Sequence, residues 1–82
     1  MPSDHARFSG YLLAVSIVTL TPREADVIGL RARGLTNAET AVLLGISEHT
    51  VKSHTREARL SLGAKNTAHA VAIALRHRLI VG

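Results

Sequence analysis

Residues 37–59 read Asn37-Ala-Glu-Thr-Ala41-Val-Leu-Leu-Gly45-Ile-Ser47-Glu-His-Thr-Val51-Lys-Ser-His-Thr-Arg-Glu-Ala-Arg59, and this stretch decides the fold. Gly45 suits the left-handed conformation that ends a helix, and Ser47 can cap the next one. The pattern predicts a short helix over 37–44 and a longer one over 48–62. Ala41 is small enough for the helices to approach closely, and Val51 supplies a buried contact. Two helices joined in this way have the form of a helix-turn-helix.

Similar start and stop signals lie on both sides of this stretch. Thr21-Pro22-Arg23-Glu24 is a capping box with proline at the first helical position, which predicts a helix from Pro22 to Arg33 that ends at Gly34. Asn66 or Thr67 can cap a fourth helix, from His69 to Leu79. We expect the inward stripe of the first helix to be Ala25, Ile28, Ala32 and Leu35. The sequence therefore predicts an all-α domain of four helices over residues 20–82. Residues 1–19 would be a separate N-terminal extension that could form a short helix or an interface segment.

The composition fits one small helical domain with an anionic partner. The 82 residues are 46% hydrophobic, with one Phe, one Tyr and no Trp, so the core must be aliphatic. Ten Lys or Arg against six Asp or Glu give a net charge of +4, which favours nucleic acid or an acidic membrane face. The longest apolar run, residues 11–20, is far shorter than the ~20 residues needed to span a bilayer. We therefore expect a cytoplasmic protein with no membrane partner.

No pattern in the sequence points to catalysis or to a bound cofactor. The absence of Cys excludes disulfides, thiol chemistry and thiolate metal sites. The four histidines of the expected helices are divided between two helices without a carboxylate cluster, so we expect no metal site. We also find no nucleophile and base arrangement and no phosphate loop. The chain is thus expected to be no enzyme, and no small-molecule ligand is evident.

The expected helix over 48–62 has two different faces. Val51, Ala58 and Leu62 fall near one face, whereas the polar and mainly basic residues fall on the other. Lys52 and Arg56 are one turn apart, and either side chain can donate to guanine O6 and N7 in the major groove. The same spacing also fits an ordinary solvated helix face on a plain pair of helices. The surrounding helix-turn-helix pattern favours the DNA-binding interpretation.

Several ordered blocks together resemble the DNA-binding domain of the LuxR/GerE family. They are Leu20-Thr-Pro-Arg-Glu24, Gly34-Leu-Thr-Asn-Ala-Glu39, Ile46-Ser-Glu-His-Thr-Val-Lys-Ser-His54 and Leu62-Gly63. The resemblance covers roughly residues 20–82. It implies a four-helix transcription regulator whose third helix, about residues 48–62, recognises double-stranded DNA and whose fourth helix commonly forms a homodimer.

The resemblance also implies roles for individual residues. Lys52, Ser53 and Arg56 match the base-facing positions. Contacts with the DNA backbone are expected from Thr36, Asn37, His49, Thr50, His54 and Lys65. Thr50 could instead tighten the first turn of its helix, His54 could be a packed structural residue, and Lys65 could be a solvated loop charge. On the fourth helix, Ala72, Ile73 and Arg76 are candidate dimer-interface residues, although its alanines could equally complete the core.

Three departures from the family pattern leave a second hypothesis open. Thr40 stands where the family usually has an aliphatic residue, and its hydroxyl can bond back to a helix carbonyl. Arg59-Leu60-Ser61 moves an apolar residue and loses a charge, and Thr67 replaces a frequent Arg. Each lost phosphate contact would lower DNA affinity. The alternative is an interaction module that pairs with a larger regulator and binds DNA weakly or not at all.

Overall fold

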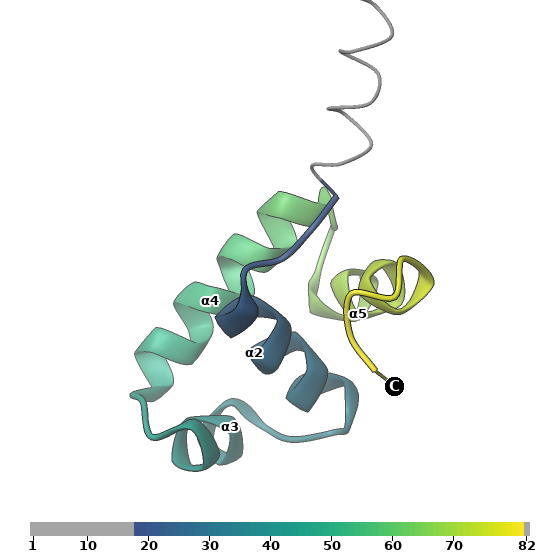
Figure 1. The fold of residues 1–82 in the computed structure, drawn as a ribbon. Coiled ribbons are helices and arrows are strands. Elements are labelled where there is room, and N and C mark those ends of the chain that lie inside the picture. Colours follow the sequence, from purple (N-terminus) through teal and green to yellow (C-terminus); the bar gives the residue numbers. More distant parts are fainter. Residues whose placement is uncertain (1–17, 82) are drawn as a thin grey trace, which may run out of the picture.

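The computed structural model describes residues 18–81, and all regular secondary structure in this range is helical. The helices are α2 (Pro22–Ala32), α3 (Asn37–Leu44), α4 (Glu48–Leu62) and α5 (Thr67–Arg76), as Figure 1 shows. The predicted all-α class with four helices is confirmed, and α3 and α4 have their predicted bounds. Residues 1–17 of the predicted N-terminal extension lie outside the described residues.

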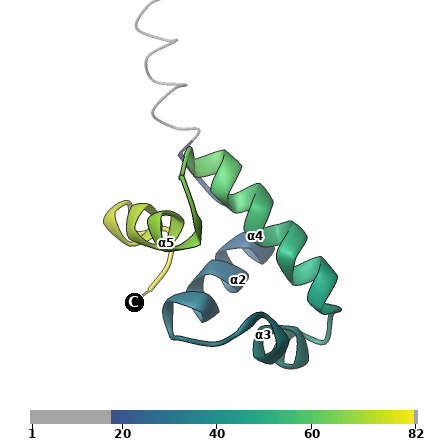
Figure 2. The same ribbon diagram turned by 180° about the vertical axis from the view of Figure 1, so that it is seen from behind.

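Helices α2 and α4 form the centre of the domain. Each of them packs against the three other helices, whereas α3 and α5 make no contact with each other. Figures 1 and 2 show α3 beside the start of α4 and α5 on the far side of α2. Within residues 18–81, no helix is long and apolar enough to cross a membrane.

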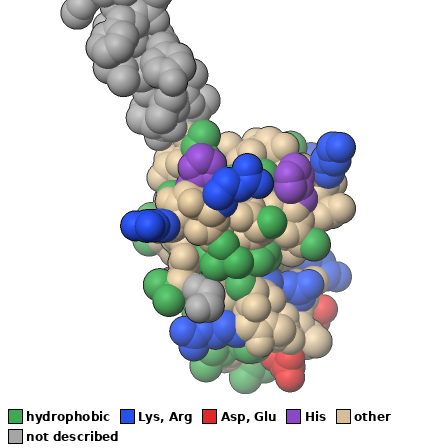
Figure 3. Space-filling model, turned by 90° about the vertical axis from the view of Figure 1, so that its right-hand side faces the viewer, with side chains coloured by type: hydrophobic (Ala, Val, Ile, Leu, Met, Phe, Trp, Pro, Cys, Tyr) green, Lys and Arg blue, Asp and Glu red, His purple; other side chains and the backbone are tan. Residues whose placement is uncertain are grey.

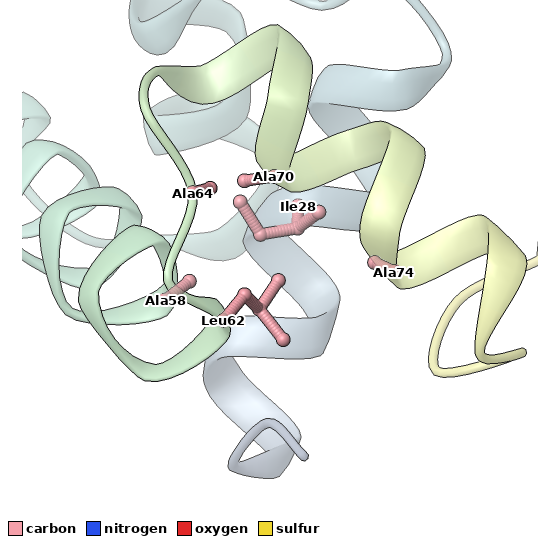
Figure 4. Close-up of a cluster of buried hydrophobic side chains, with 6 residues drawn as sticks. All are labelled: Ile28, Ala58, Leu62, Ala64, Ala70 and Ala74. Atoms are coloured by element: carbon pink, nitrogen blue, oxygen red, sulfur yellow. The ribbon is translucent and has the colours of Figure 1, made fainter. Parts of the chain in front are cut away.

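The core consists of two clusters of buried side chains. The larger cluster joins α2, α4 and α5 through Ile28, Ala58, Leu62, Ala64, Ala70 and Ala74, which Figure 4 shows. The smaller cluster joins α2, α3 and α4 through Val27, Ala41 and Val51. Alanine is the commonest residue of the larger cluster, and its small side chain lets the helix backbones approach closely. Neighbouring Val27 and Ile28 on α2 serve different clusters.

The inward stripe predicted for α2 is only partly right. Ile28 is fully buried as expected, but Val27 is also fully buried, and Ala25, Ala32 and Leu35 are only half-buried. A single stripe assumes that the helix packs on one side. Because α2 packs against three helices, it buries two neighbouring positions that point about 100° apart.

The predicted cap of the last helix at Asn66 is confirmed, but the predicted bounds, His69 to Leu79, were wrong. Helix α5 begins at Thr67, capped by Asn66, and it ends at Arg76 rather than Leu79. Arg78 has a left-handed backbone with φ +57°, and the Leu79 N–H donates to the Ala74 carbonyl at 2.8 Å. This turn brings Leu79 and Ile80 back against the larger cluster. The other three helices reach the left-handed conformation at a glycine, so a helix stop at arginine gave no sequence signal.

Candidate nucleic-acid interface

Helix α4 presents two faces of opposite character. Val51, Ala58 and Leu62 are its buried residues, as predicted. Lys52, Ser53 and Arg56 are all exposed. Lys52 and Arg56 are four residues apart, so their side chains leave the same side of the helix about 6 Å apart along its axis. The structure therefore brings the three residues predicted to face the bases together on one exposed face.

The turn between α3 and α4 fixes the direction of this face. Gly45 ends α3 with φ +68°, a conformation in which a side chain would be strained. Ser47 then caps α4, because its hydroxyl accepts from the Thr50 N–H at 3.0 Å. Ala41 is nearly fully buried against Val27 and Val51, as its predicted role requires. These contacts hold α4 against α3 without using any residue of the exposed face.

Helix α3 begins with two candidate backbone contacts. Thr36 forms a complete capping box with Glu39: its hydroxyl accepts from the Glu39 N–H at 3.1 Å, and its N–H donates to Glu39 Oε1 at 2.8 Å. The Thr36 N–H is therefore not available for a phosphate. The half-buried Asn37 accepts a hydrogen bond from Arg31, whose Nη1 lies 3.0 Å from Asn37 Oδ1.

The other residues expected to contact the DNA backbone differ in their exposure and in the contacts that they already make within the protein. His49 and Lys65 are exposed, although the Lys65 N–H donates to His69 Nδ1 at 3.0 Å. The hydroxyl of Thr50 lies 2.8 Å from that of Ser47, so this residue does tighten the first turn of α4. His54 is half-buried, and its Nδ1 lies 4.0 Å from Glu57 Oε1. The structure thus places Thr50 and His54 in contacts within their own helix, whichever further contacts they make.

The capping box of α3 also determines the charge at its N-terminus. The pKa of Glu39 is lowered because the carboxylate accepts hydrogen bonds from the Thr36 backbone and the Thr36 side chain. The carboxylate is therefore ionised at neutral pH beside Thr36 and Asn37. It favours the helix dipole but repels a nearby phosphate. Positive side chains must offset this charge if α3 is to approach DNA.

The expectation for Thr40 was wrong in one respect. Its side chain is fully buried, but among the described residues its hydroxyl has no hydrogen-bond partner, so it does not bond back to a helix carbonyl. On α4, by contrast, the Thr55 hydroxyl makes this bond to the Val51 carbonyl at 2.9 Å. A buried hydroxyl without a partner costs free energy of folding.

Two features near the candidate interface were not predicted. Arg31 contacts Asn37 from the last turn of α2, and no simple helix spacing links residues six apart across a loop. Leu60 is 60% exposed, one turn after Arg56 on the same side of α4. The sequence departure at Arg59-Leu60-Ser61 thus puts an apolar side chain at the end of the basic face.

The candidate dimer residues lie on α5. Ala72 and Arg76 are exposed, whereas Ile73 is half-buried and packs partly against the larger core cluster. Figure 3 shows the side of the molecule that carries α5, where hydrophobic side chains gather in the middle with Lys, Arg and His side chains around them. Buried Ala70 and Ala74 complete the core, so the alternative reading of the alanines holds for these two.

The described residues do not meet the requirements of a metal site. Within residues 18–81, no three His, Asp or Glu side chains are grouped so that they could hold a metal ion.

Comparison with known proteins supports the interpretation of the helix-turn-helix. The family model described as "Bacterial regulatory proteins, luxR family" matches residues 18–74. Over 76% of the chain, the fold is similar to a solved structure called "Structure of Transcription factor, GerE", with a TM-score of 0.73, 29% identity and 92% of that chain covered.

Curated relatives are longer regulators. Over 61 residues, 74% of the chain, it is 43% identical to the transcriptional activator protein BjaR1 of Bradyrhizobium diazoefficiens and 48% identical to the quorum sensing-dependent transcriptional regulator RpaR of Rhodopseudomonas palustris. Over the same length it is 39% identical to the transcriptional regulatory protein MctR of Rhizobium johnstonii. The chain spans 25% of BjaR1 and of RpaR and 28% of MctR, about a quarter of each relative.

Proposed function

Because the chain belongs to the luxR family of bacterial regulatory proteins, we propose that it binds double-stranded DNA sequence-specifically and regulates transcription. In this proposal α4 is the recognition helix and enters the major groove, while α3 braces it from the backbone side. The bases are read by Lys52, Ser53 and Arg56.

The exposed face of α4 is the observation that carries this proposal. A helix fits the major groove of B-DNA, and Lys or Arg side chains can donate to guanine O6 and N7 there. Lys52 and Arg56 point from one face with Ser53 beside them, and the buried face holds the helix on the domain. Leu60 continues this face and could contact a thymine methyl group.

Phosphate contacts would position the domain on the duplex. The proposed donors are Thr36, Asn37, His49, Thr50, His54 and Lys65. The first turn of α3 adds the N–H groups of Asn37 and Ala38, which lie too early in the helix to donate to a carbonyl one turn back. Such contacts fix orientation and carry most of the salt dependence, whereas the α4 face carries the sequence preference.

Selection from a random DNA library tests the proposal directly. Sequences recovered with the purified protein should share a motif, and gel shifts should then show that Lys52→Glu with Arg56→Glu abolishes binding to it. The matched control is Arg23→Glu with Arg33→Glu, which makes the same change in charge on an exposed residue of α2 and on its exposed C-cap. If the α4 pair binds as well as the control pair, α4 is not the recognition helix. If the wild type binds no DNA at either about 50 or about 200 mM salt, the interaction-module hypothesis replaces the proposal.

We further propose that the domain binds as a homodimer through α5. The proposed contact residues are Ala72, Ile73 and Arg76 of α5. Figure 3 shows the side of the molecule that carries α5, where hydrophobic side chains gather among mainly basic ones. An apolar patch with a polar rim is typical of an interaction surface. Ala72→Glu should leave the fold intact, because the residue is exposed, and should shift the protein from dimer to monomer in sedimentation. A selected motif without two-fold symmetry would contradict the dimer but leave DNA binding in place.

A further inference from the structure

We propose that Arg31 is a positioning residue for DNA binding, which holds the Asn37 amide so that its NH2 group is free for a phosphate oxygen. The inference rests on the proposed function of the α3 and α4 pair. It adds a residue from α2, outside the helix-turn-helix, to the machinery that contacts the DNA backbone.

The Arg31 contact spans two helices. Arg31 lies in the last turn of α2, and Asn37 is the first residue of α3. Arg31 Nη1 donates to Asn37 Oδ1 at 3.0 Å, a length typical of an N–H···O hydrogen bond. Both residues are half-buried, so the bond is partly shielded from competing water. It is the one bond between two side chains of different helices within residues 18–81.

The chemistry of the two groups fixes the orientation of the amide. A guanidinium has only donors, so the oxygen of the Asn37 amide must face Arg31. The NH2 group is bonded to the same carbon and therefore points away from Arg31. Within residues 18–81, no side chain or carbonyl accepts a hydrogen bond from this NH2 group. Among the described residues, nothing competes for its two protons at the start of α3.

This orientation matters because a phosphate accepts hydrogen bonds and repels other acceptors. A free Asn side chain can turn its oxygen or its nitrogen outward, and only the nitrogen binds a phosphate. Next to Asn37 lies the ionised carboxylate of Glu39, which disfavours an anion. Arg31 acts in two ways, since it selects the productive orientation of the amide and places a positive charge behind it.

A double-mutant cycle tests the coupling between the two residues. The probe is a fluorescein-labelled duplex of about 30 base pairs, roughly three helical turns, that carries the motif selected from the random library. Arg31→Met should weaken binding about three- to tenfold, the range of one ordinary hydrogen bond, and Asn37→Ala should weaken it similarly. In the Asn37→Ala protein, the further change Arg31→Met should cost no more than the charge it removes.

Arg33→Met is the matched control. Arg33 is exposed and lies two residues from Arg31, so this variant removes the same charge close by. Arg31→Lys should recover most of the lost affinity, since an ammonium group is also only a donor. Unfolding of each variant, measured by circular dichroism, shows which losses come from folding; if Arg31→Met does not fold, the comparison of wild type with Arg31→Lys and Asn37→Ala decides. In that case the DNA affinity of Arg31→Lys must be closer to that of the wild type than the affinity of Asn37→Ala is.

The salt dependence separates a positioning role from a direct contact. If Arg31 acts through Asn37, the slope of log affinity against log salt should fall equally in Arg31→Met and Arg33→Met. A slope that falls by about 0.9 more in Arg31→Met, with effects that add to those of Asn37→Ala, would show that Arg31 itself binds phosphate and overturn the inference. If the losses of affinity from Arg31→Met and Asn37→Ala simply add, with no difference in slope, the positioning role is also overturned, while the proposed function stays intact. A wild type that binds no DNA would overturn both.

Discussion

Replacing Thr40 with valine is expected to stabilise the protein. Thr40 is fully buried, and its hydroxyl has no hydrogen-bond partner among the described residues. A buried hydroxyl without a partner costs about 1–3 kcal/mol, because it has lost its bonds to water and gained none. Valine has nearly the same shape and helix propensity, so Thr40→Val removes this cost without creating a cavity. We expect a gain of about 1–2 kcal/mol, which corresponds to a rise in Tm of roughly 5–15 °C for a domain of this size.

The chain supplies a matched control on the neighbouring helix. Thr55 donates its hydroxyl to the Val51 carbonyl at 2.9 Å, so Thr55→Val removes a hydrogen bond that is made. It should give no gain, or a loss of up to about 1 kcal/mol. Thr40→Ser keeps the hydroxyl and loses one methyl group, which should cost about 1 kcal/mol.

Urea unfolding followed by circular dichroism measures these changes, provided that the slope of the transition is the same in all variants. The reasoning is refuted if Thr40→Val is no more stable than the wild type. In that case the Thr40 hydroxyl makes a hydrogen bond in solution, and the departure from an aliphatic residue at this position carries no cost.

Three further changes test other parts of the fold. Arg78→Gly should add about 0.5–1 kcal/mol of stability in urea unfolding, because Arg78 has φ +57° and glycine adopts this conformation without strain; no change would mean that arginine is not strained there. Ala41→Leu should destabilise the protein by about 1–3 kcal/mol, because Ala41 is packed between Val27 and Val51, and a stable variant would contradict close packing of α3 on α4. Glu39→Gln should remove a stabilisation that is present above the ordinary carboxyl pKa of about 4.5 and is lost as the pH falls through the lowered pKa of folded Glu39, so stability measured across this range should depend less on pH in the variant than in the wild type.

Local signals explain why the sequence predicts most of the fold. Three helices begin at capping residues and end at glycines with a positive φ, and these short-range contacts are readable within a few residues. The end of α5 was missed because Arg78 takes the position where glycine is usual. The burial of Val27 was missed because it depends on how α3 and α4 pack around α2, which no local pattern shows.

The candidate site likewise has features that the sequence predicts and features that depend on tertiary contacts. The exposed face of α4 follows from helical periodicity, and the structure places Lys52, Ser53 and Arg56 on it as predicted. Arg31 was missed because its bond to Asn37 crosses a loop and depends on the angle between α2 and α3. Helical spacing reports which residues share a face, whereas contacts between helices require the tertiary structure.

Because α3 and α5 do not contact each other, substitutions that change the surface of α5 and substitutions that change the α3 and α4 pair can occur independently. A substitution on the outer side of α5 reaches α3 only through α2 or α4, so it can alter what α5 binds and leave the recognition pair undisturbed. The two core clusters adjoin at Val27 and Ile28 of α2. Val27 packs in the cluster that includes α3, and Ile28 packs in the cluster that includes α5. A rotation of α2 that moved both side chains would therefore link a partner on one side of the domain to the tilt of α4 on the other.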